Sequence, residues 1–178
     1  ALPISVLELA GGGRSWRLGL TICEDLWVEE ELQGHRLAGP DPVADLLPRR
    51  VDLLLNLSAS PFGQAKAALR QRLAARAAQR LACPVVYVNQ VGGNDELVFD
   101  GASFVVDASG AVVCQLPCRR EAVALWEAAP AIAPGSEKAP QLAPQHRAPL
   151  PPEPEQLLRA LVLGVRDYAR SEEHTSEL

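Results

Sequence analysis

Cys23 is the residue of this sequence whose position most clearly suggests covalent chemistry. It follows the apolar run 16–22 and opens an acidic turn that contains Glu24 and Asp25. A thiol at the end of a buried strand, just before a chain reversal, can face a cleft while the sheet fixes its backbone. That placement suits a nucleophile. The alternative is an unreactive cysteine that packs as a small hydrophobic residue.

Strands are expected to hold this turn in place. Three apolar runs predict buried strands, at 16–22, 51–57 and 85–88. Two further strands are predicted at 102–106 and 111–116, joined by the turn residues Asp107 to Gly110. Because a short turn joins them, these two strands should pair antiparallel. The predicted fold class is therefore α/β (α+β layered), with a mixed sheet.

Helices are predicted between these strands. Asp41 can cap a helix that starts at Pro42. A longer helix is expected at about 64–82, where apolar residues recur at steps of four: Leu69, Leu73, Ala77 and Leu81. Its arginines are expected mostly to face solvent rather than to bind phosphate: Arg70, Arg72, Arg76 and Arg80.

The composition is that of a globular domain with its own core. The 178 residues are 48% hydrophobic and 22% charged, with a net charge of −5. The acidic balance argues against a nucleic-acid partner, and no apolar run approaches the roughly 18 residues that span a bilayer. Four widely spaced cysteines predict reduced thiols rather than a disulfide or zinc framework. We therefore predict no membrane partner, no metal site and a cytoplasmic location.

The C-terminal part differs in composition from residues 1–129. Residues 130–154 contain eight prolines and predict a stiff linker. A helix is expected to restart at 155–169, with one apolar face. Residues 170–178 resemble the translation of a widely used sequencing adapter, so we expect no function of them. The sequence also lacks methionine, and we expect it to be a piece of a longer bacterial protein.

Three segments carry a recognisable pattern: 19–27 (GLTICEDLW), 56–62 (NLSASPF) and 88–101 (VNQVGGNDELVFDG). Together they resemble the glutamine-dependent NAD synthetases, whose N-terminal half is a nitrilase-type (carbon-nitrogen hydrolase) glutaminase domain. The first would indicate only the wider nitrilase superfamily, whereas the third is more specific. The resemblance covers about residues 5–169. It implies that 1–129 are the C-terminal portion of the glutaminase domain and 155–169 the first helix of the synthetase domain.

The resemblance implies a partial α-β-β-α sandwich and a Cys-Glu-Lys triad. Cys23 corresponds to the nucleophile, whose thiolate attacks the side-chain amide of glutamine, forms a glutamyl thioester and releases ammonia. The backbone N–H of Glu24 would help to hold the oxyanion. The side chains of Glu24 and Asp25 have two explanations, acid–base chemistry or capping of the turn.

Three further residues correspond to the glutamine pocket of that family: Trp27, Ser60 and Lys66. Trp27 would form a wall of the pocket, with an ordinary core aromatic as the alternative. Ser60 and Lys66 would contact the polar end of glutamine, with a surface lysine as the alternative for Lys66. No cofactor-binding or metal-binding residue is implied here, because ATP and Mg²⁺ would belong to the synthetase domain of the parent protein.

The sequence departs from the family pattern upstream of the nucleophile. The family's general-base glutamate and oxyanion-stabilising lysine both lie there, whereas Glu8 is the only glutamate before Cys23 and no lysine precedes it. We therefore predict no glutaminase activity for this chain alone. The parent would be a homo-oligomer that passes ammonia from glutamine to nicotinic acid adenine dinucleotide. The alternatives are a stand-alone nitrilase-superfamily amidase and a non-catalytic nitrilase-like scaffold.

Overall fold

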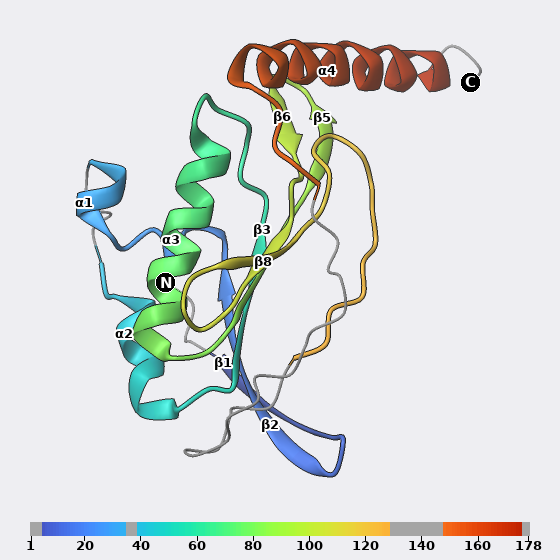
Figure 1. Cartoon of the computed structure of the whole chain (residues 1–178). Coiled ribbons are helices and arrows are strands. Elements are labelled where there is room, and N and C mark those ends of the chain that lie inside the picture. The colour runs from blue at the N-terminus through green and yellow to red at the C-terminus, as the bar shows by residue number, and fades with distance from the viewer. Residues whose placement is uncertain (1–4, 35–38, 129–147, 176–178) are drawn as a thin grey trace.

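The computed structural model describes residues 5–34, 39–128 and 148–175 (Figure 1). Its main sheet has six strands in this spatial order: β1 (Ser5–Gly11), β2 (Arg14–Ile22), β3 (Leu53–Ser58), β4 (Val85–Asn89), β7 (Phe104–Val106) and β8 (Val112–Gln115). A separate hairpin contains β5 (Val91–Asn94) and β6 (Leu97–Asp100). Strands β2, β3 and β4 run parallel, while β1, β7 and β8 pair antiparallel. The predicted mixed sheet is therefore confirmed.

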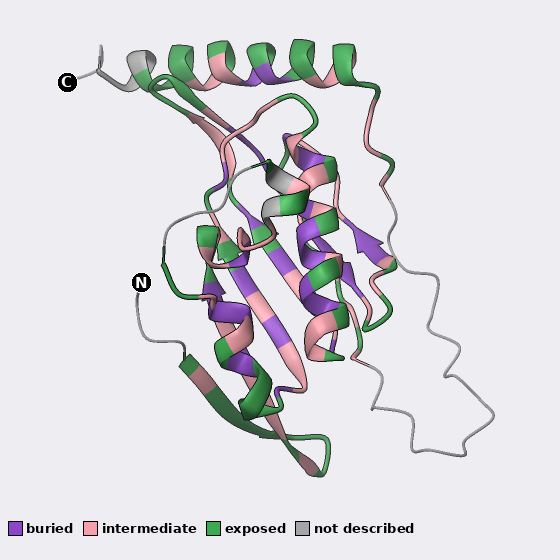
Figure 2. Cartoon of the chain, turned by 90° about the vertical axis from the view of Figure 1, so that its left-hand side faces the viewer, coloured by how far each residue is buried: buried purple, intermediate pink, exposed green. Residues whose placement is uncertain are grey.

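Helices cover one face of this sheet. They are α1 (Glu30–Gln33), α2 (Pro42–Leu46) and α3 (Lys66–Leu81), with 3₁₀ turns η1 (Cys23–Leu26) and η2 (Leu47–Arg49) (Figure 1). The core lies between helices and sheet, where Figure 2 shows the buried faces meeting: Leu26, Val43, Leu46, Leu54, Ala74, Ala77, Val85, Tyr87 and Phe104. Gly19 permits the close approach here, because a Cβ at this position would lie 3.2 Å from the Leu54 side chain.

The predicted elements between residues 16 and 116 are confirmed, together with their start and turn signals. The Asp41 carboxylate accepts a hydrogen bond from the Ala44 N–H at 2.9 Å, and Pro42 is the first residue of α2. In the turn between β7 and β8, the Asp107 carboxylate accepts from the Ser109 N–H at 2.9 Å. Polar side chains at these two ends satisfy backbone donors that would otherwise lack a partner.

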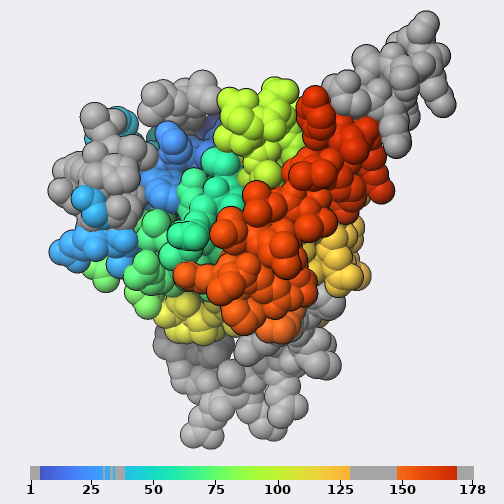
Figure 3. All heavy atoms as spheres, turned by 90° about the horizontal axis from the view of Figure 1, so that it is seen from above, coloured from blue at the N-terminus to red at the C-terminus, as the bar shows by residue number. Residues whose placement is uncertain are grey.

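The sequence did not predict β1, the short helix α1 or the β5–β6 hairpin. β1 pairs with β2 along its length, and its residues are mostly exposed. Because neither face of β1 is buried, its sequence shows no clear alternation of apolar and polar residues that would predict a strand. The sequence of β5 contains Gly92 and Gly93, which are poor strand formers. That hairpin is supported by α4 (Glu153–Thr175), since a Cβ at Gly93 would lie 3.1 Å from the Gly164 Cα. Figure 3 shows α4 lying beside the hairpin.

The predicted C-terminal helix at 155–169 lies within α4, which is longer at both ends. Most of the predicted linker at 130–154 falls outside the described residues, and residues 148–152 form no regular element. The proposed division of the chain into domains therefore stays a prediction. Of the helices that the structure describes, none is long and apolar enough to cross a membrane.

The opposite face of the sheet is also apolar. The segment after β8 covers part of it, where Trp126 and Ala124 pack on Val105 and neighbouring residues. Further along, Ile22 and Leu57 remain 55% and 54% exposed. Apart from the β5–β6 hairpin and α4, the described elements form one helix layer on one sheet layer, which is half of the four-layer sandwich that the resemblance implies.

Candidate active site

A group of buried polar side chains lies near the carboxyl ends of the three parallel strands. Thr21 on β2, Asn56 on β3 and Tyr87 on β4 are register partners in one row across the sheet. The polar residues of this region are each at most 7% exposed: Thr21, Asn56, Ser60, Arg70, Asn89 and Asp100. The carboxyl ends of parallel strands are where open α/β sheets place their ligands. This edge is therefore the candidate site.

Cys23 stands at this edge, directly after β2. It is the first residue of η1 and has a φ of 46°, in the left-handed region that residues with a side chain rarely adopt. The Asn56 amide donates to the Thr21 hydroxyl at 3.1 Å and to the Cys23 carbonyl at 3.5 Å, so β3 holds the turn. Such backbone strain persists where the surroundings fix it, as they often do around a reactive group.

The acidic residues after Cys23 have different surroundings. The Asp25 carboxylate accepts a hydrogen bond from the Ile22 N–H at 2.7 Å, which favours the capping explanation for this side chain. The Glu24 carbonyl accepts from the Trp27 N–H at 2.8 Å and closes the 3₁₀ turn. The Glu24 side chain is exposed. Its backbone N–H follows the thiol residue immediately, as the oxyanion prediction requires.

Lys66 and Trp27 lie together beside this turn. Lys66 is the first residue of α3, and its ammonium nitrogen lies 5.3 Å from the centroid of the Trp27 ring. Burial and the positive charge of Arg70 lower the pKa of Lys66, while Cys23, Asp100 and Glu24 act in the opposite direction. These influences indicate that Lys66 lies within electrostatic reach of the thiol. The structure thus brings Cys23, Glu24, Trp27 and Lys66 to one place.

Ser60 is fixed at both backbone polar groups. It is 2% exposed, and its N–H donates to the Asn89 side-chain oxygen at 2.9 Å. Its carbonyl accepts from the Asn89 amide at 3.3 Å and from the Arg70 guanidinium at 3.5 Å. Asn89 therefore ties the loop before α3 to the end of β4. Sequence reasoning gave Asn89 no role, although a polar residue directly after a buried strand is a signal for one.

An ion pair between Arg70 and Asp100 lies beneath the site. Arg70 donates to both carboxylate oxygens of Asp100, at 2.7 and 2.6 Å, and the two side chains are 2% and 0% exposed. The Arg70 guanidinium also donates to the Lys66 carbonyl at 3.3 Å. Through these bonds and the one to Ser60, the pair contacts the backbone of both residues predicted to bind the polar end of glutamine. The pair therefore holds the backbone of Ser60 and Lys66 in place.

The prediction that Arg70 faces solvent was wrong. The face of α3 that packs on the sheet also contains Ala67, Ala74 and Ala77, at helical spacing from Arg70. The alanines leave room for the long arginine side chain to reach Asp100 under the helix. Arg72 and Arg76 are exposed as predicted, whereas Arg80 is partly buried and pairs with Glu29 and Asp41.

Comparison with known proteins shows which family the chain belongs to. The profile of the carbon-nitrogen hydrolases matches residues 2–130. The chain belongs to the carbon-nitrogen hydrolase family. A glutamine-dependent NAD(+) synthetase of Synechocystis is 42% identical over 153 residues, covering 85% of this chain and 26% of that protein. One from Rhodobacter capsulatus is 34% identical over 164 residues, covering 86% of this chain and 25% of that protein.

A solved structure agrees with this carbon-nitrogen hydrolase assignment. The glutamine-dependent NAD+ synthetase of Acinetobacter baumannii, in complex with ADP, superposes with a TM-score of 0.72 at 29% identity. The match covers 93% of this chain and 28% of that one. The resemblance inferred from the motifs is thereby confirmed. The chain spans about a quarter of the length of these three relatives.

The four cysteines of this carbon-nitrogen hydrolase are free thiols in different surroundings. Burial raises the pKa of Cys83 to about 12, and it also raises the pKa of Cys114 and of Cys118. Within residues 5–34, 39–128 and 148–175, no group of three or more His, Cys, Asp or Glu side chains could hold a metal ion. Thiol chemistry is therefore best suited to Cys23, which is half-buried and follows directly after β2.

We expect iodoacetamide at pH 8 to alkylate Cys23 first, at least about 10-fold faster than the other three cysteines. The thiolate is the reactive form, and a pKa of about 12 leaves Cys83 only about 10⁻⁴ ionised at that pH. Timed quenching followed by peptide mass spectrometry measures the four rates. In 6 M guanidinium the difference between the four alkylation rates should disappear. If Cys118 were the fastest cysteine to react in the folded chain, the prediction would be contradicted.

Proposed function

We propose that this chain is part of the glutaminase domain of a glutamine-dependent NAD synthetase and that Cys23 is its nucleophile. The observation that carries the proposal is the position of Lys66, whose ammonium nitrogen lies 5.3 Å from the Trp27 ring beside the turn that Cys23 opens. These are the residues that the motif resemblance assigned to the glutamine pocket. The relatives found are themselves named for glutamine-dependent NAD synthesis.

The arrangement supports a covalent route for hydrolysis of the glutamine side-chain amide. The Cys23 sulfur attacks the amide carbon, and the Glu24 N–H donates to the oxygen that becomes negative. The C–N bond then breaks, ammonia leaves with the proton it gains, and a glutamyl thioester remains. Water hydrolyses the thioester to glutamate and restores the thiol. A general-base glutamate, which the family places upstream of the nucleophile, would move the protons.

The pocket residues would orient glutamine for this attack. The Trp27 ring offers an apolar wall for the methylene groups, and the Lys66 ammonium can pair with the α-carboxylate. Ser60 would contact the same polar end, held in place by Asn89 and Arg70. The Arg70–Asp100 pair would act indirectly, because it contacts the backbone of Ser60 and Lys66 rather than the substrate.

In the parent protein, we propose that the released ammonia amidates nicotinic acid adenine dinucleotide at the expense of ATP, with Mg²⁺. The ATP and metal sites would belong to a synthetase domain, with α4 as its first helix. The parent would act in the cytoplasm as a homo-oligomer. This part of the proposal follows from the relatives' names and the motif resemblance.

A chloromethyl ketone analogue of glutamine tests the pocket without requiring turnover. Displacement of its chloride by the Cys23 thiolate should add one adduct, detected by intact mass and assigned by peptide mapping. Cys23→Ser should remove the adduct. Lys66→Met should slow labelling by about 10-fold or more, because it removes a charged partner of the carboxylate, while the rate with iodoacetamide should change little.

The matched control is a chloromethyl ketone that lacks the α-amino and α-carboxylate groups. Glutamine in excess should slow labelling by the glutamine analogue and leave the truncated reagent unaffected. Equal rates with the two reagents, and no protection by glutamine, would contradict the proposed pocket even if Cys23 proved reactive.

A further inference from the structure

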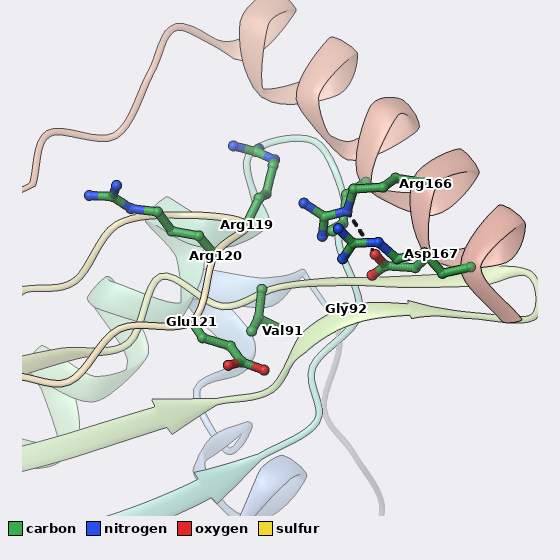
Figure 4. A pocket seen from close by; sticks show the side chains of 9 residues that line it. Val91, Gly92, Arg119, Arg120, Glu121, Arg166 and Asp167 are labelled. Atoms are coloured by element: carbon green, nitrogen blue, oxygen red, sulfur yellow. Dashed lines mark hydrogen bonds and ion pairs between the residues drawn. The ribbon is translucent and has the colours of Figure 1, made fainter. Parts of the chain in front are cut away.

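A second polar pocket lies beneath α4. It has a volume of about 340 Å³ and is lined by residues of β5, of the segment after β8 and of α4. Cavities of roughly 300–1,000 Å³ are the usual size of small-molecule sites. None of its lining residues belongs to the candidate active site. Its charged lining residues are Arg119, Arg120, Glu121, Arg166, Asp167 and Arg170 (Figure 4).

Arg119 is the unusual residue of this pocket. It is 6% exposed, and none of its three guanidinium nitrogens has a hydrogen-bond partner among the residues that the structure describes. Its guanidinium carbon lies 5.5 Å from the centroid of the Phe62 ring, a contact that leaves the N–H donors unused. A buried guanidinium without an acceptor is unfavourable, so the position calls for a negatively charged partner.

The backbone fixes Arg119 in this position. Its φ of 61° lies in the left-handed region, and its N–H donates to the Asp100 carbonyl at 2.9 Å. The preceding residue, Cys118, forms a bridge with Gly101. A long side chain on a strained and anchored backbone is held toward the pocket rather than toward bulk solvent.

The acidic residues of the pocket do not neutralise Arg119. The Asp167 carboxylate accepts from the Gly93 N–H at 2.8 Å and from the Arg166 side chain at 2.9 Å. In Figure 4, the side chains of Arg119 and Arg166 point into the space beneath α4, while the Glu121 carboxylate points away from it. Basic side chains outnumber acidic ones in the lining even without Arg170, which lies in the segment 170–178.

We propose that this pocket binds a phosphate group, with Arg119 as its principal contact and Arg166 beside it. Guanidinium groups donate paired, charge-assisted hydrogen bonds to phosphate oxygens, and a tetrahedral group can accept from two arginines on different elements. The volume exceeds that of one phosphate, so pyrophosphate or a small phosphate ester also fits. The inference does not depend on glutamine chemistry at Cys23, since the two sites share no lining residue.

The test measures binding of inorganic phosphate and of pyrophosphate to the 178-residue chain, against sodium chloride at matched ionic strength. Thermal unfolding should shift upward with either ligand, as expected for a ligand that binds the folded state. Arg119→Met should weaken the apparent affinity by between about 10-fold and 100-fold. Arg72→Met, at an exposed arginine of α3, is the matched control and should bind like the unchanged chain.

Two further measurements distinguish a loss of phosphate binding in Arg119→Met from a loss of folding. Arg119→Lys keeps the charge but loses the paired donors, so its affinity should fall between those of the unchanged chain and Arg119→Met. Hydrogen exchange with phosphate present should slow in peptides covering 117–121 and 160–167, and not in the C-terminal half of α3. An equal phosphate response in Arg119→Met, protection elsewhere, or no response in the unchanged chain would each overturn the proposal.

Discussion

Replacing Asp100 by asparagine is expected to destabilise the chain by about 3–5 kcal/mol. The substitution keeps the size of the side chain but removes the negative charge that Arg70 contacts at 2.6 and 2.7 Å. Arg70 is 2% exposed, so water cannot replace the lost partner without opening the structure. The free energy of unfolding in urea, measured at pH 7, gives the loss directly.

The matched control lies on the surface of α4. Arg159 and Glu155 form an ion pair one helical turn apart, and both side chains are largely exposed. Glu155→Gln should lower the free energy of unfolding by about 0.5 kcal/mol or less, since solvent screens such pairs. If Asp100→Asn and Glu155→Gln lowered the free energy of unfolding by similar amounts, the importance assigned to the buried Arg70–Asp100 pair would be contradicted.

A double variant, Arg70→Met with Asp100→Leu, separates stability from positioning. Apolar residues of similar volume often replace a buried ion pair with little loss of stability. The double variant should therefore regain most of the stability lost in Asp100→Asn. The double variant should nevertheless react more slowly than the unchanged chain with the glutamine chloromethyl ketone, because it lacks the Arg70 hydrogen bonds to the Lys66 and Ser60 carbonyls.

The position of Cys23 could be predicted because strand ends are local features. An apolar run followed by an acidic turn indicates where a strand stops, and parallel strands bring their carboxyl ends to one edge. The left-handed backbone of Cys23 could not be predicted in the same way. It depends on Asn56, a residue 33 positions further along the chain, which holds the Cys23 carbonyl.

The burial of Arg70 shows how residue type can outweigh spacing in a prediction. The repeat Leu69, Leu73, Ala77 defined an apolar side, and the arginine was therefore assigned to solvent. In the structure Leu73 and Ala77 are buried as predicted, but the buried face extends through Ala67 and Ala74 and therefore includes Arg70. What makes a charge tolerable there is Asp100, which lies 30 residues away and on another element.

The β5–β6 hairpin illustrates a different limit. Its glycines read as a loop, because they lack side chains that favour a strand. In the structure they are the feature that allows α4 to lie against it, with Gly93 facing Gly164. The composition of the hairpin does not predict its contact with α4, nor the reverse, because the contact depends on a glycine in each of the two segments.

In the proposed full-length synthetase, Cys23→Ala is expected to lower the rate of ammonia release from glutamine by about 10⁴-fold or more. The thioester route needs the sulfur, and the remaining pocket can only orient glutamine for slow attack by water. Colorimetric or enzyme-coupled detection of ammonia measures the loss. Cys118→Ala is the matched control, because burial raises the pKa of Cys118 and it lies outside the proposed pocket.

The same variant distinguishes the proposed parent from a stand-alone amidase. If ammonia is passed to a synthetase domain, Cys23→Ala should still form NAD when ammonium chloride replaces glutamine, at a rate close to that of the unchanged protein. The lost sulfur would then affect only the supply of ammonia. Loss of both reactions would mean that Cys23 supports the fold, and retention of glutamine-dependent synthesis would exclude it as the nucleophile. We do not expect the loss of both reactions. Alanine, like cysteine, has an unbranched Cβ, so it can adopt the positive φ of position 23 at similar strain.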